Sequence, residues 1–233
     1  MLELIYRCCE DDQKANFRPQ WFSKVKALKS LVKAFGQNEE VNLHAIHDGP
    51  IGPLYDLLQE YNFNIDKINV RSNGQSLEAS LGYAVGLYKS ELLYFAEDDY
   101  VYTNRAYQTL IDGYSIHTKK PNEISFISGY DHPDRLTRTD DLDHGRTFVY
   151  CGEVCHWRTA ESTTCTWAMT QDDFLDFGYK LAIEYGLNDR GMFRAALGMG
   201  KRLITPMPGF STHCHLPFLS PVVDWEKISN EIL

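Results

Sequence analysis

The sequence predicts an α/β fold built on a mostly parallel sheet. Within residues 1–102, short apolar runs alternate four times with segments whose apolar residues recur at helical spacing. This alternation is typical of βα units, whose strands pair in parallel. The fourth apolar run, residues 92–96, ends abruptly in Glu97, Asp98 and Asp99. Open α/β sheets bind ligands at the ends of such strands, so we expect a site there.

Four strands and three helices are predicted in the first half of the chain. The strands cover residues 2–8, 41–47, 65–70 and 92–96, each a short apolar run beside polar or turn residues. The helices run from the N-cap Ser23 to Gly36, over residues 54–61 and over residues 76–88. Because parallel crossovers are right-handed, the strand ends collect on one edge. We expect Arg7, Asp48, residues 72–74 and residues 97–99 to converge there.

The second half has a less regular pattern. Helices are predicted over residues 106–114, over residues 171–185 with Thr170 as cap, and from Asn188 and Asp189 onward. Strands are predicted over residues 123–128, 147–151, 163–170 and 202–205, and the tail from residue 206 is rich in loops. The polar segment 131–146 has no periodicity, which is typical of a functional or mobile loop.

Composition excludes several classes of protein. The chain has 233 residues, enough for one large domain, and a hydrophobic content of 43%, enough for a core. Its net charge of −9, without a basic stripe, argues against a nucleic-acid partner and against a polybasic membrane anchor. No apolar run is long enough to span a membrane, and no signal peptide is recognisable. The six cysteines form no disulfide framework, so we expect a reduced, cytoplasmic protein.

The acidic triplet carries the functional argument. Three adjacent carboxylates after a buried strand repel one another, and a divalent cation among them makes the arrangement favourable. An acidic protein that handles phosphates also needs a cation to bridge them. We therefore interpret Glu97, Asp98 and Asp99 as a metal site that holds a phosphorylated ligand. The alternative is an acidic surface turn.

These features resemble the GT-A fold of nucleotide-sugar glycosyltransferases, in its family-2-like branch. The triplet at residues 97–99 is similar to the DXD motif of those enzymes, and Asp48 is similar to the aspartate that closes their second strand. The segment Ser72-Asn73-Gly74 resembles their third-strand loop. Asp189, at the start of a helix, resembles the acidic residue that serves as their catalytic base, although Asn188 stands where the family usually has Glu and the QXXRW signature is absent. The chain also resembles the small GT-A domain of a chlorovirus enzyme.

The resemblance implies a single GT-A domain over residues 1–233. Residues 1–102 would form the nucleotide-sugar half, and residues 103–233 the acceptor half. Asp99 and His213 would bind Mn²⁺ or Mg²⁺, because several GT-A enzymes use a C-terminal histidine as a metal ligand. Glu97 or Asp98 would reach the ribose or a metal-bound water. The nucleotide would also contact the residues Arg7, Asp48, Asn73 and Gly74.

The implied activity is transfer of a sugar, with inversion, from a UDP-linked donor to a carbohydrate hydroxyl. Asp189 would be the general base. Each assignment has a structural alternative: Asp189 stabilises a helix N-terminus, Asp48 forms a turn, and His213 is a loop residue with His215 as a competing ligand. Trp157 either stacks on the acceptor or packs in the core.

Other functions remain open from the residues alone. A structural zinc site formed by Cys151, Cys155 and His156 with residues 213–215 is one alternative. A sugar nucleotidyltransferase should carry a Gly-rich basic loop after the first strand, and Arg7-Cys8-Cys9-Glu10 is unlike it. A metallophosphatase would need histidines at several strand ends. A non-catalytic sugar-binding module would bind sugar without nucleotide or metal.

Overall fold

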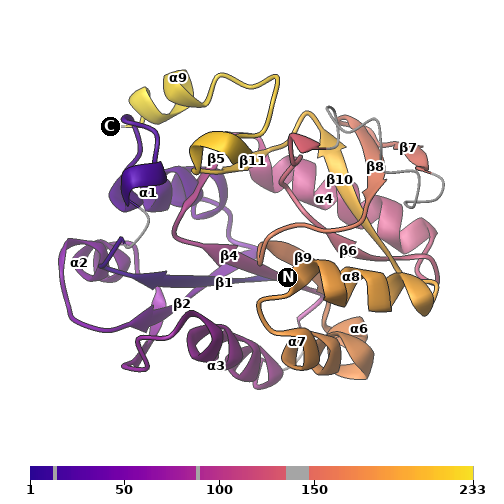
Figure 1. Cartoon of the computed structure of the whole chain (residues 1–233), viewed down its shortest axis with the longest axis horizontal. Helices are drawn as coiled ribbons and strands as arrows, with labels where there is room; N and C mark the ends of the chain where they lie inside the picture. Colours follow the sequence, from indigo (N-terminus) through magenta and orange to yellow (C-terminus); the bar gives the residue numbers. More distant parts are fainter. Residues whose placement is uncertain (13–14, 88–89, 135–146, 233) are drawn as a thin grey trace.

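A large mixed sheet organises the molecule. The computed structural model describes residues 1–12, 15–87, 90–134 and 147–232 (Figure 1). Within them the sheet has the order β3-β2-β1-β4-β9-β6-β10-β8-β7. Its strands are β1 (Leu2–Cys9), β2 (Val41–Asp48), β3 (Asn64–Ile68), β4 (Leu92–Glu97), β6 (Ile124–Ile127), β7 (Val149–Cys151), β8 (His156–Ala160), β9 (Trp167–Thr170) and β10 (Arg202–Met207).

The four strands β3, β2, β1 and β4 are parallel, which confirms the alternation predicted for the first half. Arg7 of β1 lies opposite Glu97 of β4, and Cys9 lies opposite Asp48 of β2. These strands therefore end on the same edge. β9 joins β4 antiparallel, and β6 and β10 then run parallel to each other.

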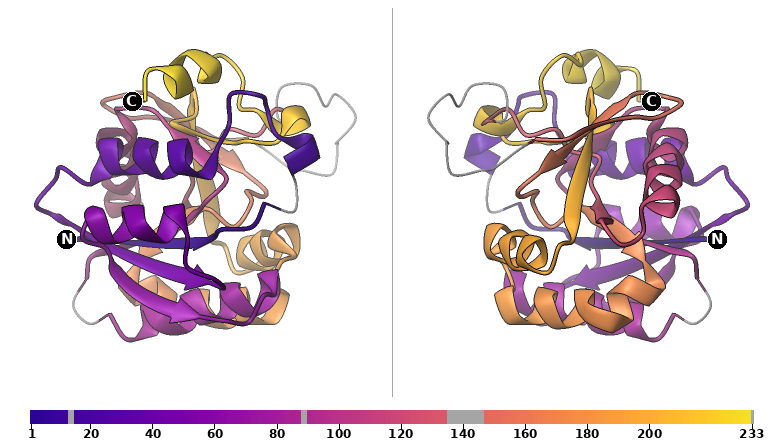
Figure 2. Two further views of the ribbon diagram at one scale, coloured as in Figure 1. Left: turned by 90° about the vertical axis from the view of Figure 1, so that its left-hand side faces the viewer. Right: turned by 90° about the vertical axis from the view of Figure 1, so that its right-hand side faces the viewer.

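Helices cover both faces of the sheet, as Figure 2 shows. Core residues of α1 (Lys24–Phe35), α2 (Pro53–Glu60) and α4 (Ala106–Lys119) pack on one face. The other face is covered by α3 (Asn73–Val85), α7 (Tyr179–Tyr185), α8 (Asp189–Gly198) and their neighbours. The predicted helix over residues 171–185 is one continuous helical segment, in which α6 (Gln171–Asp173) passes through a π-helical turn (Phe174–Gly178) into α7.

Side-chain N-caps fix the first residues of three helices, α1, α3 and α8. Ser23 is the N-cap of α1, as predicted, and Asn188 is the N-cap of α8; the side chain of each accepts a backbone N–H bond. Ser72 caps α3, so this helix begins at Asn73, three residues before the predicted start. Asn73 and Gly74 therefore belong to a helical first turn and not to a loop.

A second, small sheet brings the C-terminal part of the chain to the acidic triplet. It pairs β5 (Tyr100–Tyr102) with β11 (Ser211–His213) antiparallel, and His213 lies opposite Tyr100. A short 3₁₀ turn (Leu216–Phe218) and α9 (Trp225–Asn230) follow. Trp225 packs with Ala27 of α1 and with Cys214.

Some elements differ from the prediction. β8 occupies residues 156–160, which the sequence pattern left irregular, and α4 continues to Lys119, beyond the predicted end at residue 114. Most of the predicted polar loop 131–146 lies outside the described residues. Among the described helices, none combines the length and apolarity that crossing a bilayer requires.

Candidate active site

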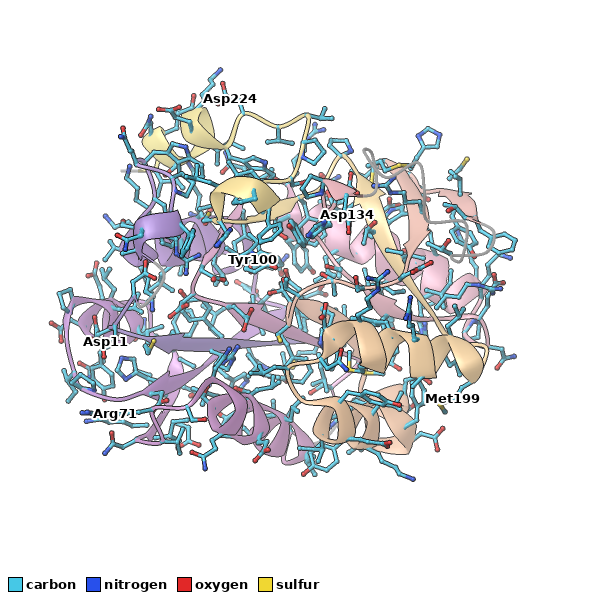
Figure 3. The ribbon with its side chains drawn as sticks, viewed as in Figure 1. Asp11, Arg71, Tyr100, Asp134, Met199 and Asp224 are labelled. Atoms are coloured by element: carbon cyan, nitrogen blue, oxygen red, sulfur yellow. The ribbon has the colours of Figure 1, made fainter. Side chains whose placement is uncertain are left out.

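A cavity of about 540 Å³ lies at the carboxyl ends of β1, β2 and β4. Figure 3 labels Asp11 and Arg71 on the same side of the molecule, and both belong to the cavity wall. The predicted site residues on this wall are Arg7, Asp48, Asn73, Glu97, Asp98, Asp99, Asp189 and His213. Gly74 is not part of it. Further charged residues on the wall are Asp11, Asp12, Arg18, Lys24 and Arg71. The convergence expected from the right-handed crossovers is thus observed, with Gly74 as the exception.

Glu97 and Asp98 are each paired with a cation of the chain. Glu97 Oε1 binds Arg7 Nη2, and Asp98 Oδ2 accepts a hydrogen bond from Lys24 Nζ at 2.8 Å. Burial alone would lower the pKa of Lys24, but the charge of Asp98 and its hydrogen bond raise that pKa above its ordinary value. Lys24 is therefore protonated. Protein cations therefore relieve part of the repulsion among these acids.

Arg7 links the end of β1 to the first turn of α3. Its Nη1 donates to the backbone oxygen of Asn73 at 3.1 Å, to Asn73 Oδ1 and to Ser76 Oγ at 2.9 Å. These contacts fix the guanidinium beside Glu97. Asn73 therefore orients Arg7, whereas Gly74 makes none of these contacts and is only part of the first turn of α3.

Asp99 and His213 meet on the cavity wall. His213 Nε2 lies 3.0 Å from Asp99 Oδ2, and both side chains are about 10% exposed. The β5–β11 pairing brings together these two residues, which are 114 positions apart in the chain. The His213 ring stacks on Tyr100, with centroids 5.4 Å apart and planes 11° apart. His215 lies beyond it, stacked on the ring of Phe17.

Arg18 also contacts Asp99. It lies between a short 3₁₀ turn (Ala15–Phe17) and α1, and its Nη2 is 3.0 Å from Asp99 Oδ2. Its Nη1 donates to the backbone oxygen of Cys214 at 2.9 Å. Burial alone would lower the pKa of Arg18, but the charge of Asp99 raises it. Asp99 therefore lies between an imidazole and a guanidinium.

Asp48 holds the loop that follows β3. Its Oδ1 accepts hydrogen bonds from the backbone N–H groups of Val70 at 2.8 Å and Arg71 at 3.0 Å. Arg71 has a φ of 50°, a conformation that non-glycine residues rarely adopt. Asp48 stabilises this turn and also lines the cavity, so the structural and the binding interpretations both apply to its position.

Asp189 is the first residue of α8 and lines the cavity from the second half of the chain. The N-cap is Asn188, whose Oδ1 accepts from Gly191 N at 3.1 Å. Asn188 therefore performs the capping, and the Asp189 side chain is not the cap. Thr164, Cys165 and Leu187 line the wall next to it.

The donor set suits a metal bound by two protein ligands. Within the described residues, no group of three or more His, Cys, Asp or Glu side chains is arranged to hold a metal ion. Two donors bound at right angles to one cation, each at about 2.1 Å, lie about 3 Å apart. The Asp99–His213 contact is a hydrogen bond of 3.0 Å, so the two side chains are already close enough to bind one cation together. A metal here would take its remaining ligands from a phosphorylated substrate and water.

The structure contradicts the stacking role considered for Trp157 and gives no support to the zinc site considered from the sequence. Trp157 is fully buried, and its Nε1 donates to Asp112 Oδ2 at 2.9 Å, so it packs in the core and does not stack on an acceptor. The zinc alternative gains no metal-holding group among the described residues. Cys214 is instead buried in the apolar cluster beside Trp225.

Sequence reasoning missed two cations of the wall. Arg18 and Arg71 lie in the loops after β1 and β3, where α/β folds position ligand-binding residues. The signal that could have identified them is a basic residue in each of these strand-to-helix connections, at Asn16-Phe17-Arg18-Pro19 and at Val70-Arg71-Ser72.

Comparison with solved structures identifies the fold as GT-A. One similar structure is glucosyl-3-phosphoglycerate synthase from Mycobacterium tuberculosis in complex with Mn²⁺, uridine diphosphate and phosphoglyceric acid. The match covers 99% of this chain and 75% of the synthase chain. Its TM-score is 0.55 and its identity 10%. S. aureus TarS matches 88% of this chain at 12% identity and a TM-score of 0.50, and this chain spans about a third (34%) of it. No protein-family model and no curated protein sequence matches the chain.

Proposed function

We propose that the chain is a metal-dependent glycosyltransferase that transfers a sugar from a nucleoside diphosphate sugar, with UDP as the nucleotide, to a carbohydrate hydroxyl. One observation carries the proposal: the strand-end acids of residues 97–99 meet His213 on one cavity wall. The GT-A fold supports the same class, and the similar synthase was crystallised with UDP-glucose and Mn²⁺.

Asp99 and His213 would hold the metal. Imidazole is a borderline ligand, which favours Mn²⁺ over Mg²⁺. When bound, the metal acts as a Lewis acid that stabilises the charge developing on the diphosphate leaving group. The two side chains are well suited to this task because packing against Tyr100 and the β5–β11 pairing fix the imidazole.

The nucleotide would lie along the strand ends. Asp48 would contact the base, and Glu97 or Asp98 would reach the ribose. Arg7 contributes positive charge from a position fixed by Asn73 and Glu97. Gly74 does not line the cavity, so it is left out of the proposed nucleotide contacts.

Asp189 would be the general base. Its carboxylate takes the proton from the acceptor hydroxyl while the acceptor oxygen attacks the anomeric carbon. The new glycosidic C–O bond forms as the bond to the diphosphate oxygen breaks, and the nucleoside diphosphate leaves with that electron pair. In-line attack inverts the configuration.

The test is UDP release from a panel of UDP-sugars in Mn²⁺, with candidate oligosaccharide acceptors. Wild type is compared with Asp99→Asn and with Asp176→Asn, a matched change at an exposed position outside the cavity. We expect release by wild type and Asp176→Asn, with at least about a hundredfold loss in Asp99→Asn. Equal turnover in all three proteins contradicts the proposal.

A further inference from the structure

Each acid of the triplet is paired with a protein cation, but only one of these cations shares an oxygen with the proposed metal site. Glu97 pairs with Arg7 and Asp98 with Lys24, and neither acid needs to bind the metal directly. Asp99 is different, because its Oδ2 lies 3.0 Å from both Arg18 Nη2 and His213 Nε2.

A metal bound to Asp99 and His213 competes with Arg18 for the charge of a single carboxylate. The Asp99 oxygen that contacts His213 is Oδ2, which Arg18 Nη2 also contacts at 3.0 Å, and the guanidinium would repel a divalent cation bound there. The side chain is only 7% exposed, so solvent does little to screen this repulsion. Metal binding at this oxygen therefore favours movement of Arg18 away from Asp99.

The cavity offers Arg18 a second partner once a nucleotide is present. A planar guanidinium pairs well with phosphate oxygens, often through two parallel hydrogen bonds. Arg18 is held to Asp12 only by long contacts of 3.3 to 3.4 Å, whereas its bond to the Cys214 backbone oxygen is 2.9 Å. The bond from Nη1 to the Cys214 oxygen anchors one side of the guanidinium. Nη2, which contacts Asp99, is left to exchange its partner.

We propose that Arg18 exchanges partners during substrate binding: it neutralises Asp99 in the empty cavity, and it binds the diphosphate when the metal takes Asp99. The inference rests on the proposed function. It makes Arg18 a diphosphate-binding residue and couples the two ligands thermodynamically. Metal alone has to displace Arg18 without compensation, whereas metal and diphosphate together give it a new partner. Each ligand then tightens the binding of the other by the same factor.

The test measures Mn²⁺ binding without nucleotide, by the electron paramagnetic resonance signal of free Mn²⁺, and UDP binding at saturating Mn²⁺, by calorimetry. Arg18→Gln is compared with wild type and with Arg71→Gln, which removes the same charge from the same cavity wall away from the triplet. We expect Arg18→Gln to bind Mn²⁺ alone at least about tenfold more tightly and UDP with Mn²⁺ at least about tenfold more weakly. Arg71→Gln should change Mn²⁺ affinity less than about threefold.

Arg18→Lys serves as the second variant in case Arg18→Gln folds poorly. It keeps the positive charge, so Mn²⁺ affinity should stay within about threefold of wild type, while loss of the planar guanidinium weakens UDP binding. Unchanged Mn²⁺ affinity in Arg18→Gln, or an equal increase in Arg71→Gln, overturns the exchange. If wild type binds no UDP, the proposed function fails, and the Mn²⁺ comparison still decides whether Arg18 competes for Asp99.

Discussion

Replacing Asp48 by Ala should destabilise the protein, because this carboxylate holds the turn after β3. Its Oδ1 accepts two backbone N–H bonds, at 2.8 and 3.0 Å, in a position that is 8% exposed. A hydrogen bond to a charged group contributes about 1.5–3 kcal/mol, and two that share one acceptor are not fully additive. We therefore expect a loss of about 2–4 kcal/mol for Asp48→Ala. In a chain of this size, that lowers the melting temperature by about 5–15 °C.

Asp48→Asn separates stability from nucleotide binding. Its amide oxygen can still accept both N–H bonds, so the stability loss should be about 1 kcal/mol or less. If Asp48 also contacts the base, the variant should bind UDP about tenfold more weakly at nearly normal stability. Thermal denaturation and calorimetric titration of both variants measure the two effects. A melting temperature for Asp48→Ala within about 2 °C of wild type would refute the role given to these hydrogen bonds.

Three further predictions concern the core, the base and the pH dependence of stability. Trp157→Phe should lower the free energy of unfolding in denaturant by about 2–4 kcal/mol, because it removes buried surface and the hydrogen-bond donor to Asp112. UDP affinity should stay the same. Normal stability together with lost acceptor binding would contradict the core position of Trp157. Asp189→Asn should lower turnover by about 10² to 10⁴-fold with little change in UDP affinity or melting temperature, and a parallel loss of UDP affinity would argue against a base. Burial alone would raise the pKa of Glu3, but hydrogen bonds from Asn42, His44 and Ser90 lower it overall. Its stabilising contribution is therefore complete above its unfolded pKa of about 4.3 and is lost as pH falls through the lower folded value. Unfolding midpoints measured between pH 7 and pH 3 should fall less steeply in Glu3→Gln, and equal slopes would contradict this.

Local patterns predicted the half of the fold that holds the acidic triplet. Apolar runs and helical spacing define β1 to β4 and the intervening helices, and the rule of right-handed crossovers then placed Arg7, Asp48 and Glu97 on one edge. The start of α3 was misplaced because the capping signal of Ser72 precedes the apolar residues by several positions.

Long-range pairings lie beyond such patterns. β8 went unrecognised because its polar and apolar residues do not alternate clearly, and Trp157 is buried by long-range contacts that include its hydrogen bond to Asp112 of α4. The counter-ions of the triplet come from positions 74 to 90 residues away. Sequence reasoning treated three adjacent acids as a cluster that a metal must neutralise, whereas the fold supplies Arg7, Arg18 and Lys24 for part of that task.

The proposed metal–diphosphate site is tested by calorimetric titration with UDP, with and without Mn²⁺, on wild type and on Asp99→Ala. Wild type should bind UDP tightly only when Mn²⁺ is present, and Asp99→Ala should lose this metal-dependent binding while remaining folded. Absence of UDP binding to wild type under both conditions, or binding that neither Mn²⁺ nor Asp99 affects, would contradict a metal–diphosphate site at the end of β4.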